Sequence, residues 1–139
     1  MTDLAHGQKG KIESIKRSKV LEQNRVFTAG EFCNQNEDEA DIEDLIGLDL
    51  YLELVNAAYD LKGENILTPA DVSKSGVNSP RIVKQVEAIW WSKPELPEFD
   101  HFFPARYLIE HPETINSTNA ADAVKRFERL FQKLNLLIA

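Results

Sequence analysis

Apolar residues recur along this chain mainly at intervals of three and four, the spacing of helices. The first such stretch spans residues 48 to 61. Its main stripe consists of Leu48, Tyr51, Leu52, Val55 and Tyr59, and a second apolar side consists of Leu50, Leu54 and Leu61. The pattern predicts a helix that is buried on more than one face.

Two further stretches have the same periodicity. After Ser79-Pro80, which predicts an N-cap followed by proline in the first turn, one stripe consists of Ile82, Val83, Val86, Ile89 and Trp90. The last stretch follows a cap at Ser117 or Thr118, and its stripe consists of Val124, Phe127, Phe131, Leu134 and Ile138. Shorter helices are predicted over residues 8 to 20 and from Pro104 to His111.

One segment favours a strand instead. Arg25 to Ala29 is rich in strand-forming residues, is too short for a helix and ends at Gly30. The expected fold class is therefore α/β but helix-rich, with one or two strands near the amino end and helices after them.

Composition limits the class of protein. The chain has 139 residues, of which 42% are hydrophobic and 28% charged, as expected for one globular domain. It has neither an apolar run long enough for a membrane span nor a signal peptide, so we expect no membrane association and a cytoplasmic location. Cys33 is the only cysteine, which excludes an internal disulfide and a cysteine-built zinc site.

The net charge of −7 is unevenly distributed. Between Glu31 and Leu61 there are ten acidic residues and no Lys or Arg, whereas the segment from Lys9 to Arg25 is basic. The basic segment has two interpretations: contact with nucleic-acid phosphates, or a solvated surface helix, which the acidic whole favours.

The acidic segment contains the main candidate for chemistry, residues 39 to 45 (EADIEDL). In a helix, Asp41 and Asp44 would share one face, with Glu43 and Glu39 close enough to add oxygen ligands. Mg²⁺ and Mn²⁺ prefer such ligands. The alternative is that these acids complement a helix dipole and face water.

Other candidates are weaker. The three histidines lack a metal-ligand spacing, and Cys33 has no catalytic partner nearby, which favours packing. Asp100-His101 suits either an oriented general base or an ordinary N-cap. Trp90-Trp91 and Phe102-Phe103 suit either a stacking platform or, for one residue of each pair, the core. The chain has no glycine-rich phosphate loop and no GxSxG motif.

Five segments in succession resemble the carboxy-terminal region of bacterial AAA-type ATPases that carry an OLD-like TOPRIM nuclease domain. They are MTDLAHGQKGKIESIKRSKVL (1–21), RVFTAGEFCNQNEDEADIEDL (25–45), LYLELVNAAY (50–59), FDHFFPARYL (99–108) and FERLFQKLNLL (127–137). The resemblance covers most of the chain.

The resemblance implies a divalent-metal site for DNA cleavage. Asp3 would be the second aspartate of the family's DxD pair, and Glu43 the later acid, with Asp41 and Asp44 as its neighbours. It thus implies metal ligation of Mg²⁺ or Mn²⁺ by Asp3, Asp41, Glu43 and Asp44, with Glu43 and Asp41 catalytic. The family's early glutamate is missing, and Met1 stands at the first DxD aspartate. Some members also have a lysine ahead of the segment that corresponds to Phe103-Pro104-Ala105, but here that neighbourhood reads His101-Phe102-Phe103.

These departures predict the distal part of an endonuclease that is inactive as an isolated chain. Residues 1–47 would form a partial TOPRIM-like layer and residues 48–139 a helical subdomain. The expected partner is an amino-terminal ATPase/TOPRIM half, which would supply the missing strand and acids, or a second copy. The partial sheet would have a bare edge, which either self-association or the chain's own amino-terminal segment would cover. The alternative function is a non-catalytic acidic helical module, whose acidic face meets a basic partner and whose last helix packs in a helical core or a dimer.

Overall fold

The chain is described here by a computed structural model that covers residues 9–17, 26–33 and 39–138. Every regular element in these ranges is a helix. The α-helices are α1 (Lys9–Arg17), α2 (Leu48–Ala58), α3 (Pro69–Lys74), α4 (Ile82–Trp91), α5 (Phe103–Glu110) and α6 (Ala121–Ile138). The 3₁₀ helices are η2 (Ala29–Phe32), η3 (Ile42–Leu45), η4 (Gly63–Asn65) and η5 (Pro112–Thr114).

The strand predicted at residues 25–29 is wrong for residues 26–29, and Arg25 lies outside the described residues. Within the described residues, β-structure is limited to isolated bridge residues at Thr28 and Ala40, and η2 begins at Ala29. Glu31 Oε1 accepts a hydrogen bond from the Thr28 N–H at 3.0 Å, which closes a tight turn just after Phe27. Because this local bond satisfies the backbone and Phe27 is buried at the same time, the segment gains little from strand pairing.

The expected α/β fold class is therefore wrong for the described chain. A TOPRIM-like layer requires strands that pair with one another, and the described residues contain single bridges where one or two strands were expected. The bare sheet edge expected from that layer is likewise not found among the described residues. The fold is all-helical over the ranges that the structure describes.

The helices expected from periodicity are confirmed at α1, α2, α4, α5 and α6, with corrections at two starts. Ser79 was expected to cap α4, but the cap residue is Arg81. α6 begins at Ala121, after a turn in which Asn116 Oδ1 accepts from the N–H groups of Thr118 and Asn119. The short helix α3 was not predicted, because residues 61–80 contain many turn-forming residues.

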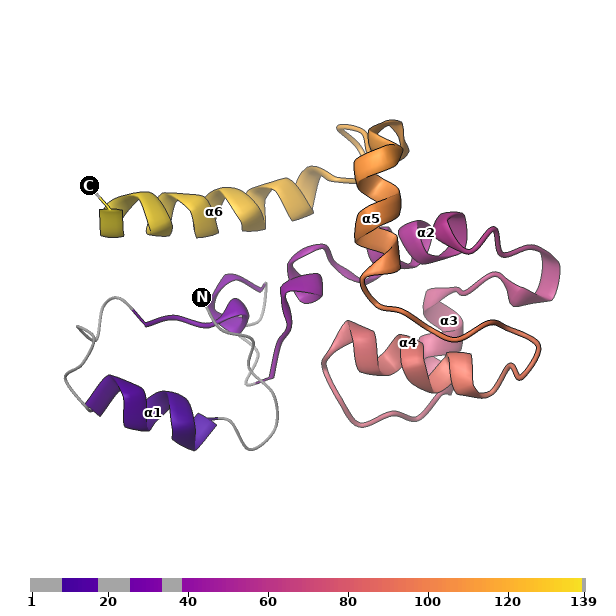
Figure 1. Cartoon of the computed structure of the whole chain (residues 1–139), viewed down its shortest axis with the longest axis horizontal. Helices are drawn as coiled ribbons and strands as arrows, with labels where there is room; N and C mark the ends of the chain where they lie inside the picture. Colours follow the sequence, from indigo (N-terminus) through magenta and orange to yellow (C-terminus); the bar gives the residue numbers. More distant parts are fainter. Residues whose placement is uncertain (1–8, 18–25, 34–38, 139) are drawn as a thin grey trace.

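The larger core lies between α2, α3 and α4. Its fully or nearly buried members are Tyr51, Leu52, Val55, Leu67, Ile82, Val83, Val86, Ile89 and Trp90. All of these except Leu67 belong to the stripes identified in the sequence for α2 and α4, so the apolar periodicity of both helices faces one shared interior. Figure 1 shows α2, α3, α4 and α5 gathered at one end of the molecule.

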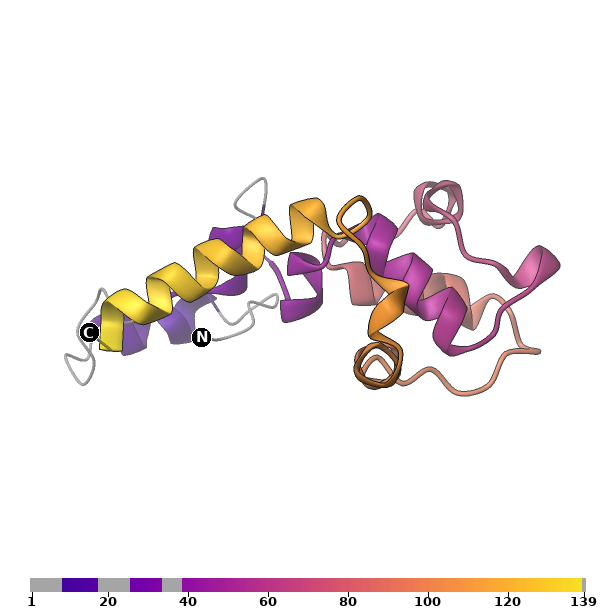
Figure 2. The ribbon, with the colours of Figure 1, turned by 90° about the horizontal axis from the view of Figure 1, so that it is seen from above.

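A second core lies beneath α6. Leu130 packs against Phe27, which lies just before the cap residue of η2, against Phe32 of η2 and against Leu45 of η3. Arg129 Nη2 also donates to the Phe32 carbonyl at 2.7 Å. Contacts therefore join α6 to segments that precede residue 47. Figures 1 and 2 show α6 running away from the α2–α5 group and over η2.

A helix that crosses a bilayer must be about 20 residues long and mostly apolar. None in the described ranges combines the length and the apolar composition needed to cross a membrane.

Candidate functional site

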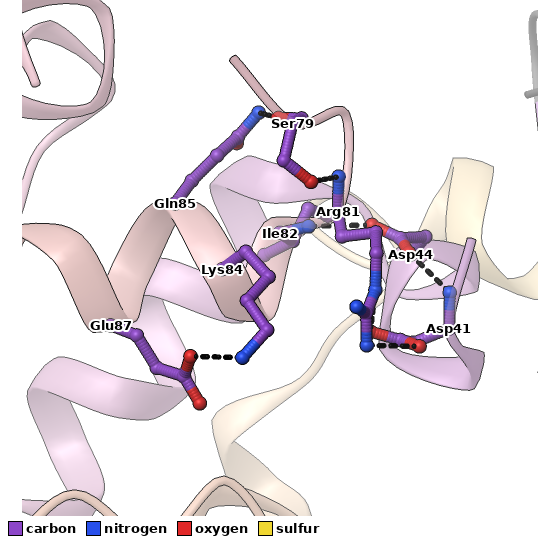
Figure 3. A network of polar contacts seen from close by, with 8 residues as sticks. All are labelled: Asp41, Asp44, Ser79, Arg81, Ile82, Lys84, Gln85 and Glu87. Carbon is purple, nitrogen blue, oxygen red and sulfur yellow. Dashed lines mark hydrogen bonds and ion pairs between the residues drawn. The ribbon is translucent and has the colours of Figure 1, made fainter. Parts of the chain in front are cut away.

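The acidic segment that carries the predicted metal site folds into the tight turn η3. Asp41 is the cap residue of η3, and its backbone N–H donates to Asp44 Oδ2 at 2.6 Å. An aspartate three residues after a cap residue is well placed to accept this bond. The Asp44 side chain therefore points back toward Asp41 instead of outward to solvent (Figure 3).

Asp44 also holds the beginning of α4. Its second oxygen, Oδ1, accepts a hydrogen bond from the Ile82 N–H at 2.8 Å. The first N–H groups of a helix lack partners within the helix, and a carboxylate placed there also favours the helix dipole. Burial raises the pKa of Asp44 above its usual value, although the hydrogen bonds from Ile82 and Asp41 act in the opposite direction.

Asp41 forms a two-point ion pair with Arg81. Arg81 Nε donates to Oδ2 at 2.7 Å, and Arg81 Nη2 donates to Oδ1 at 2.8 Å. Asp41 is only 6% exposed, and the hydrogen bonds with it raise the pKa of Arg81. Both carboxylate oxygens of Asp41 therefore bind a guanidinium in the geometry that this pair prefers.

A polar cavity of about 230 Å³ opens beside this ion pair. Its charged lining consists of Asp41, Glu43, Arg81, Lys84 and Glu87, and His101 and Phe102 complete one side. Lys84 Nζ lies 2.6 Å from Glu87 Oε2, so the lining contains two acid–base pairs, Asp41 with Arg81 and Glu87 with Lys84 (Figure 3). Such a lining neutralises much of its own charge, whereas a magnesium site concentrates carboxylates.

The structure thus places three of the four predicted ligands together. Asp41, Glu43 and Asp44 lie in or next to η3, and Asp3 lies outside the described residues. Among the residues that are described, no group of three or more His, Cys, Asp or Glu side chains is arranged to hold a metal ion. The catalytic and metal-binding roles of these acids stay predictions, while the observed bonds of Asp41 and Asp44 are structural.

Sequence reasoning missed three charged members of this cavity, two basic and one acidic. Arg81, Lys84 and Glu87 were not singled out, because an ion pair between residues 40 positions apart has no signal in local spacing. His101 was considered as a base, and it lines the cavity with its ring beside that of Phe102, 3.9 Å between centroids. Cys33 packs against the core beneath α6 and donates to the Ala29 carbonyl, in agreement with a packing role.

A second hollow has a very different character. It is an apolar groove of about 290 Å³ between α2, α5 and α6. Leu50, Leu54, Ala120 and Ala123 are its buried members. The more open lining consists of Leu108, Ile115, Val124, Phe127 and Phe131, and Glu128 is the only charged residue among those that line it.

The walls of the apolar groove are open to solvent. Val124 is 49% exposed and Phe131 is 56% exposed. Both belong to the stripe that predicted α6, so only part of that stripe faces the core. Large apolar side chains that remain exposed around a groove are typical of protein interaction sites.

Acidic side chains lie on one side of the apolar groove, in the hollow next to it. Glu53 of α2 accepts from Asn119 Nδ2 at 2.9 Å, which ties α2 to the turn before α6. Asp49 and Asp122 line the hollow next to it, together with Asn119 and Arg126. Arg126 is buried and donates to the carbonyls of Leu45 and Ile46, so its charge is directed into the molecule.

Comparison of the chain with protein families, with characterised proteins and with solved structures gives no match.

Proposed function

We propose that this chain is a non-catalytic helical interaction module that binds an amphipathic helix of a protein partner in the apolar groove. The observation that carries the proposal is the groove itself, in which buried residues of α2 and α6 form a base and Val124 and Phe131 form an exposed wall. An amphipathic helix laid in such a groove buries apolar area on both partners.

The charges indicate what the partner helix carries beside its apolar face. Glu128 lines the groove, Asp49 and Asp122 line the hollow next to it, and Glu53 is bonded to Asn119 of that hollow. Lys125, the neighbouring exposed cation of α6, lies 3.4 Å from Asp122. Acids on this rim favour a partner with Lys or Arg beside its apolar stripe, because complementary charges guide association.

The bonds of the acidic segment support a structural role for it. Asp41 and Asp44 fix η3 against the start of α4 through bonds to Arg81 and Ile82. These bonds hold the acidic segment against the start of α4.

The test uses a labelled model helix of Leu and Lys that has one apolar face, and fluorescence anisotropy as the measurement. We expect saturable binding, and at least tenfold weaker binding of a scrambled peptide of the same composition. Phe131→Ser should weaken binding about tenfold, because it removes one large side chain from the contact. Leu136→Ser is the matched control: Leu136 is 77% exposed on α6 and does not line the groove.

Two results would contradict the proposal: equal binding of the scrambled peptide, or equal loss in both variants. The alternative function, DNA cleavage by a metal held at Glu43, is tested with supercoiled plasmid and Mn²⁺. Nicking by the wild type that disappears in Glu43→Gln would support the nuclease and overturn the proposed module. Glu43→Gln is the variant of choice because it preserves the size of the side chain, whereas Asp41→Ala breaks the ion pair with Arg81.

A further inference from the structure

The outer face of α6 bears apolar residues at a spacing of seven. Val124, Phe131 and Ile138 are 49%, 56% and 82% exposed. Residues seven apart in an α-helix lie nearly in line along one side, so the three side chains form a stripe. We call Val124, Phe131 and Ile138 the outer stripe.

The outer stripe begins at the apolar groove and continues past it. Val124 and Phe131 line the groove, whereas Ile138 lies at the other end of α6 and does not. One helix thus carries an apolar receptor site near its start and an exposed apolar side chain at its end. Val124 and Ile138 are 14 residues apart, which is about 21 Å along the helix.

We propose that the helix in the groove is α6 of a second copy of this chain, packed antiparallel about a two-fold axis at Phe131. The inference rests on the proposed function and names its partner. In this arrangement Phe131 meets Phe131 of the other copy, and each Ile138 lies beside the other copy's Val124, in its groove. The groove and the Ile138 side chain that enters the other copy's groove lie on one surface of the chain. A two-fold interface requires such a self-complementary surface.

The polar residues next to the outer stripe agree with this antiparallel arrangement. Glu128 lies at the groove on the side of α6 that also carries Asn135. The two-fold axis at Phe131 brings Glu128 toward Asn135 of the other copy, whose side-chain amide donates to a carboxylate. The two Glu128 residues lie about 9 Å apart along the helix axis, so like charges do not meet.

The experiment measures the mass of the full chain in solution by sedimentation equilibrium over a range of concentrations. We expect a mass twice that of the 15.8 kDa chain at high concentration. Phe131→Glu should be monomeric, because it places two carboxylates together at the axis, and so should Phe131→Lys. A mixture of these two variants should recover the dimer. Leu136→Glu is the matched control, exposed on α6 but outside the outer stripe, and should dimerise like the wild type.

A double variant distinguishes the antiparallel arrangement from a parallel one. In the variant that combines Val124→Glu with Ile138→Lys, antiparallel packing places each new glutamate beside the other copy's new lysine, and the dimer is retained. Parallel packing places like charges together, and the dimer is lost.

Four results would overturn the inference: a wild-type chain that is monomeric at every concentration, failure of the mixture to recover a dimer, disruption by Leu136→Glu equal to that by Phe131→Glu, or loss of the dimer in the double variant. Circular dichroism is used to check that each variant is folded. If the wild type is monomeric and still binds the Leu and Lys helix, the inference fails while the proposed function stands. If neither the second copy nor the model helix binds, both fail.

Discussion

Arg126 occupies the space in which a side chain at Gly47 would stand. A Cβ built on Gly47 lies 2.6 Å from Arg126 Nη2, and the φ angle of Gly47 is +89°. The guanidinium of Arg126 donates to the carbonyls of Leu45 and Ile46, at 2.7 and 2.9 Å. Glycine is thus required here both by the backbone conformation and by the arginine that holds α6 to the end of η3.

The first prediction concerns this pair. Gly47→Ala should lower the free energy of unfolding by about 2–4 kcal/mol, since it combines a positive φ with displacement of a buried hydrogen-bonded arginine. Urea denaturation measures the change. Gly63→Ala is the control: Gly63 has a φ of +58° and no atom within 4 Å of its Cβ position, so it should cost only about 1 kcal/mol. Equal losses in both variants would contradict the role of Arg126.

A second prediction concerns the ion pair between Asp41 and Arg81. The side chains are 8% and 19% exposed, so a double-mutant cycle to alanine should give a coupling of about 1–3 kcal/mol in stability. The control pair is Asp122 and Lys125, which is 75% and 73% exposed and should couple by less than about 0.5 kcal/mol. Chemical denaturation of the four chains of each cycle provides the values. Additive losses at Asp41 and Arg81 would show that the pair does not stabilise the fold.

The third prediction is that two aspartates titrate on opposite sides of the ordinary pKa of 3.8. Hydrogen bonds from the Thr68 hydroxyl and N–H lower the pKa of Asp71, whereas burial raises the pKa of Asp44. Carbon-13 shifts of the carboxyl groups, followed by NMR against pH, measure both values. The reverse order of the two aspartates would contradict the assigned causes.

The two shifts have opposite consequences for stability. Folded Asp71 binds a proton more weakly than the unfolded chain does, so its contribution is present above pH 3.8 and is lost as the pH falls through its lowered pKa. Folded Asp44 binds a proton more tightly, so its contribution is present below pH 3.8 and is lost as the pH rises through its raised pKa. Asp71→Asn should therefore reduce the loss of stability in acid, when unfolding is followed from pH 5 to pH 2.

The last prediction concerns the two neighbouring tryptophans of α4. Trp90 is 4% exposed and donates to the Pro97 carbonyl at 2.7 Å, whereas Trp91 is 81% exposed. Acrylamide should therefore quench the fluorescence of Trp91 strongly and that of Trp90 weakly. Trp91→Phe should leave the weakly quenched emission and Trp90→Phe the strongly quenched one. Similar quenching in both variants would contradict the orientation of α4.

Trp90 and Trp91 also illustrate how far sequence reasoning reaches. Adjacent positions of a helix point in directions about 100° apart, so one residue of the pair had to face the core. Periodicity identified that face correctly in α2 and α4, because burial of a stripe requires only that a core exists on one side. It did not identify the cap of α4, where the acceptor is Asp44, which lies 38 positions earlier in the chain.

The amino-terminal part shows the opposite case. Val26, Phe27 and Thr28 suit a strand by composition, but Glu31 closes a 3₁₀ turn at this point. The ring centroids of Phe27 and Phe32 lie 5.5 Å apart, and Phe27 packs against Leu130. Strand propensity reflects the neighbours that a sheet provides, and among the described residues the neighbour is α6. The resemblance to a TOPRIM region was therefore misleading for the fold.

The sequence by itself determined the helices and their apolar sides, because spacing along a helix converts directly into direction in space. It also identified the acidic segment, since charge is a property of the residues alone. Only the tertiary structure decided what those acids bind, because Asp41 meets Arg81 through folding over 40 positions. The tertiary structure likewise decided which part of the α6 stripe faces the core and which part remains on the surface, because that depends on where the other helices end.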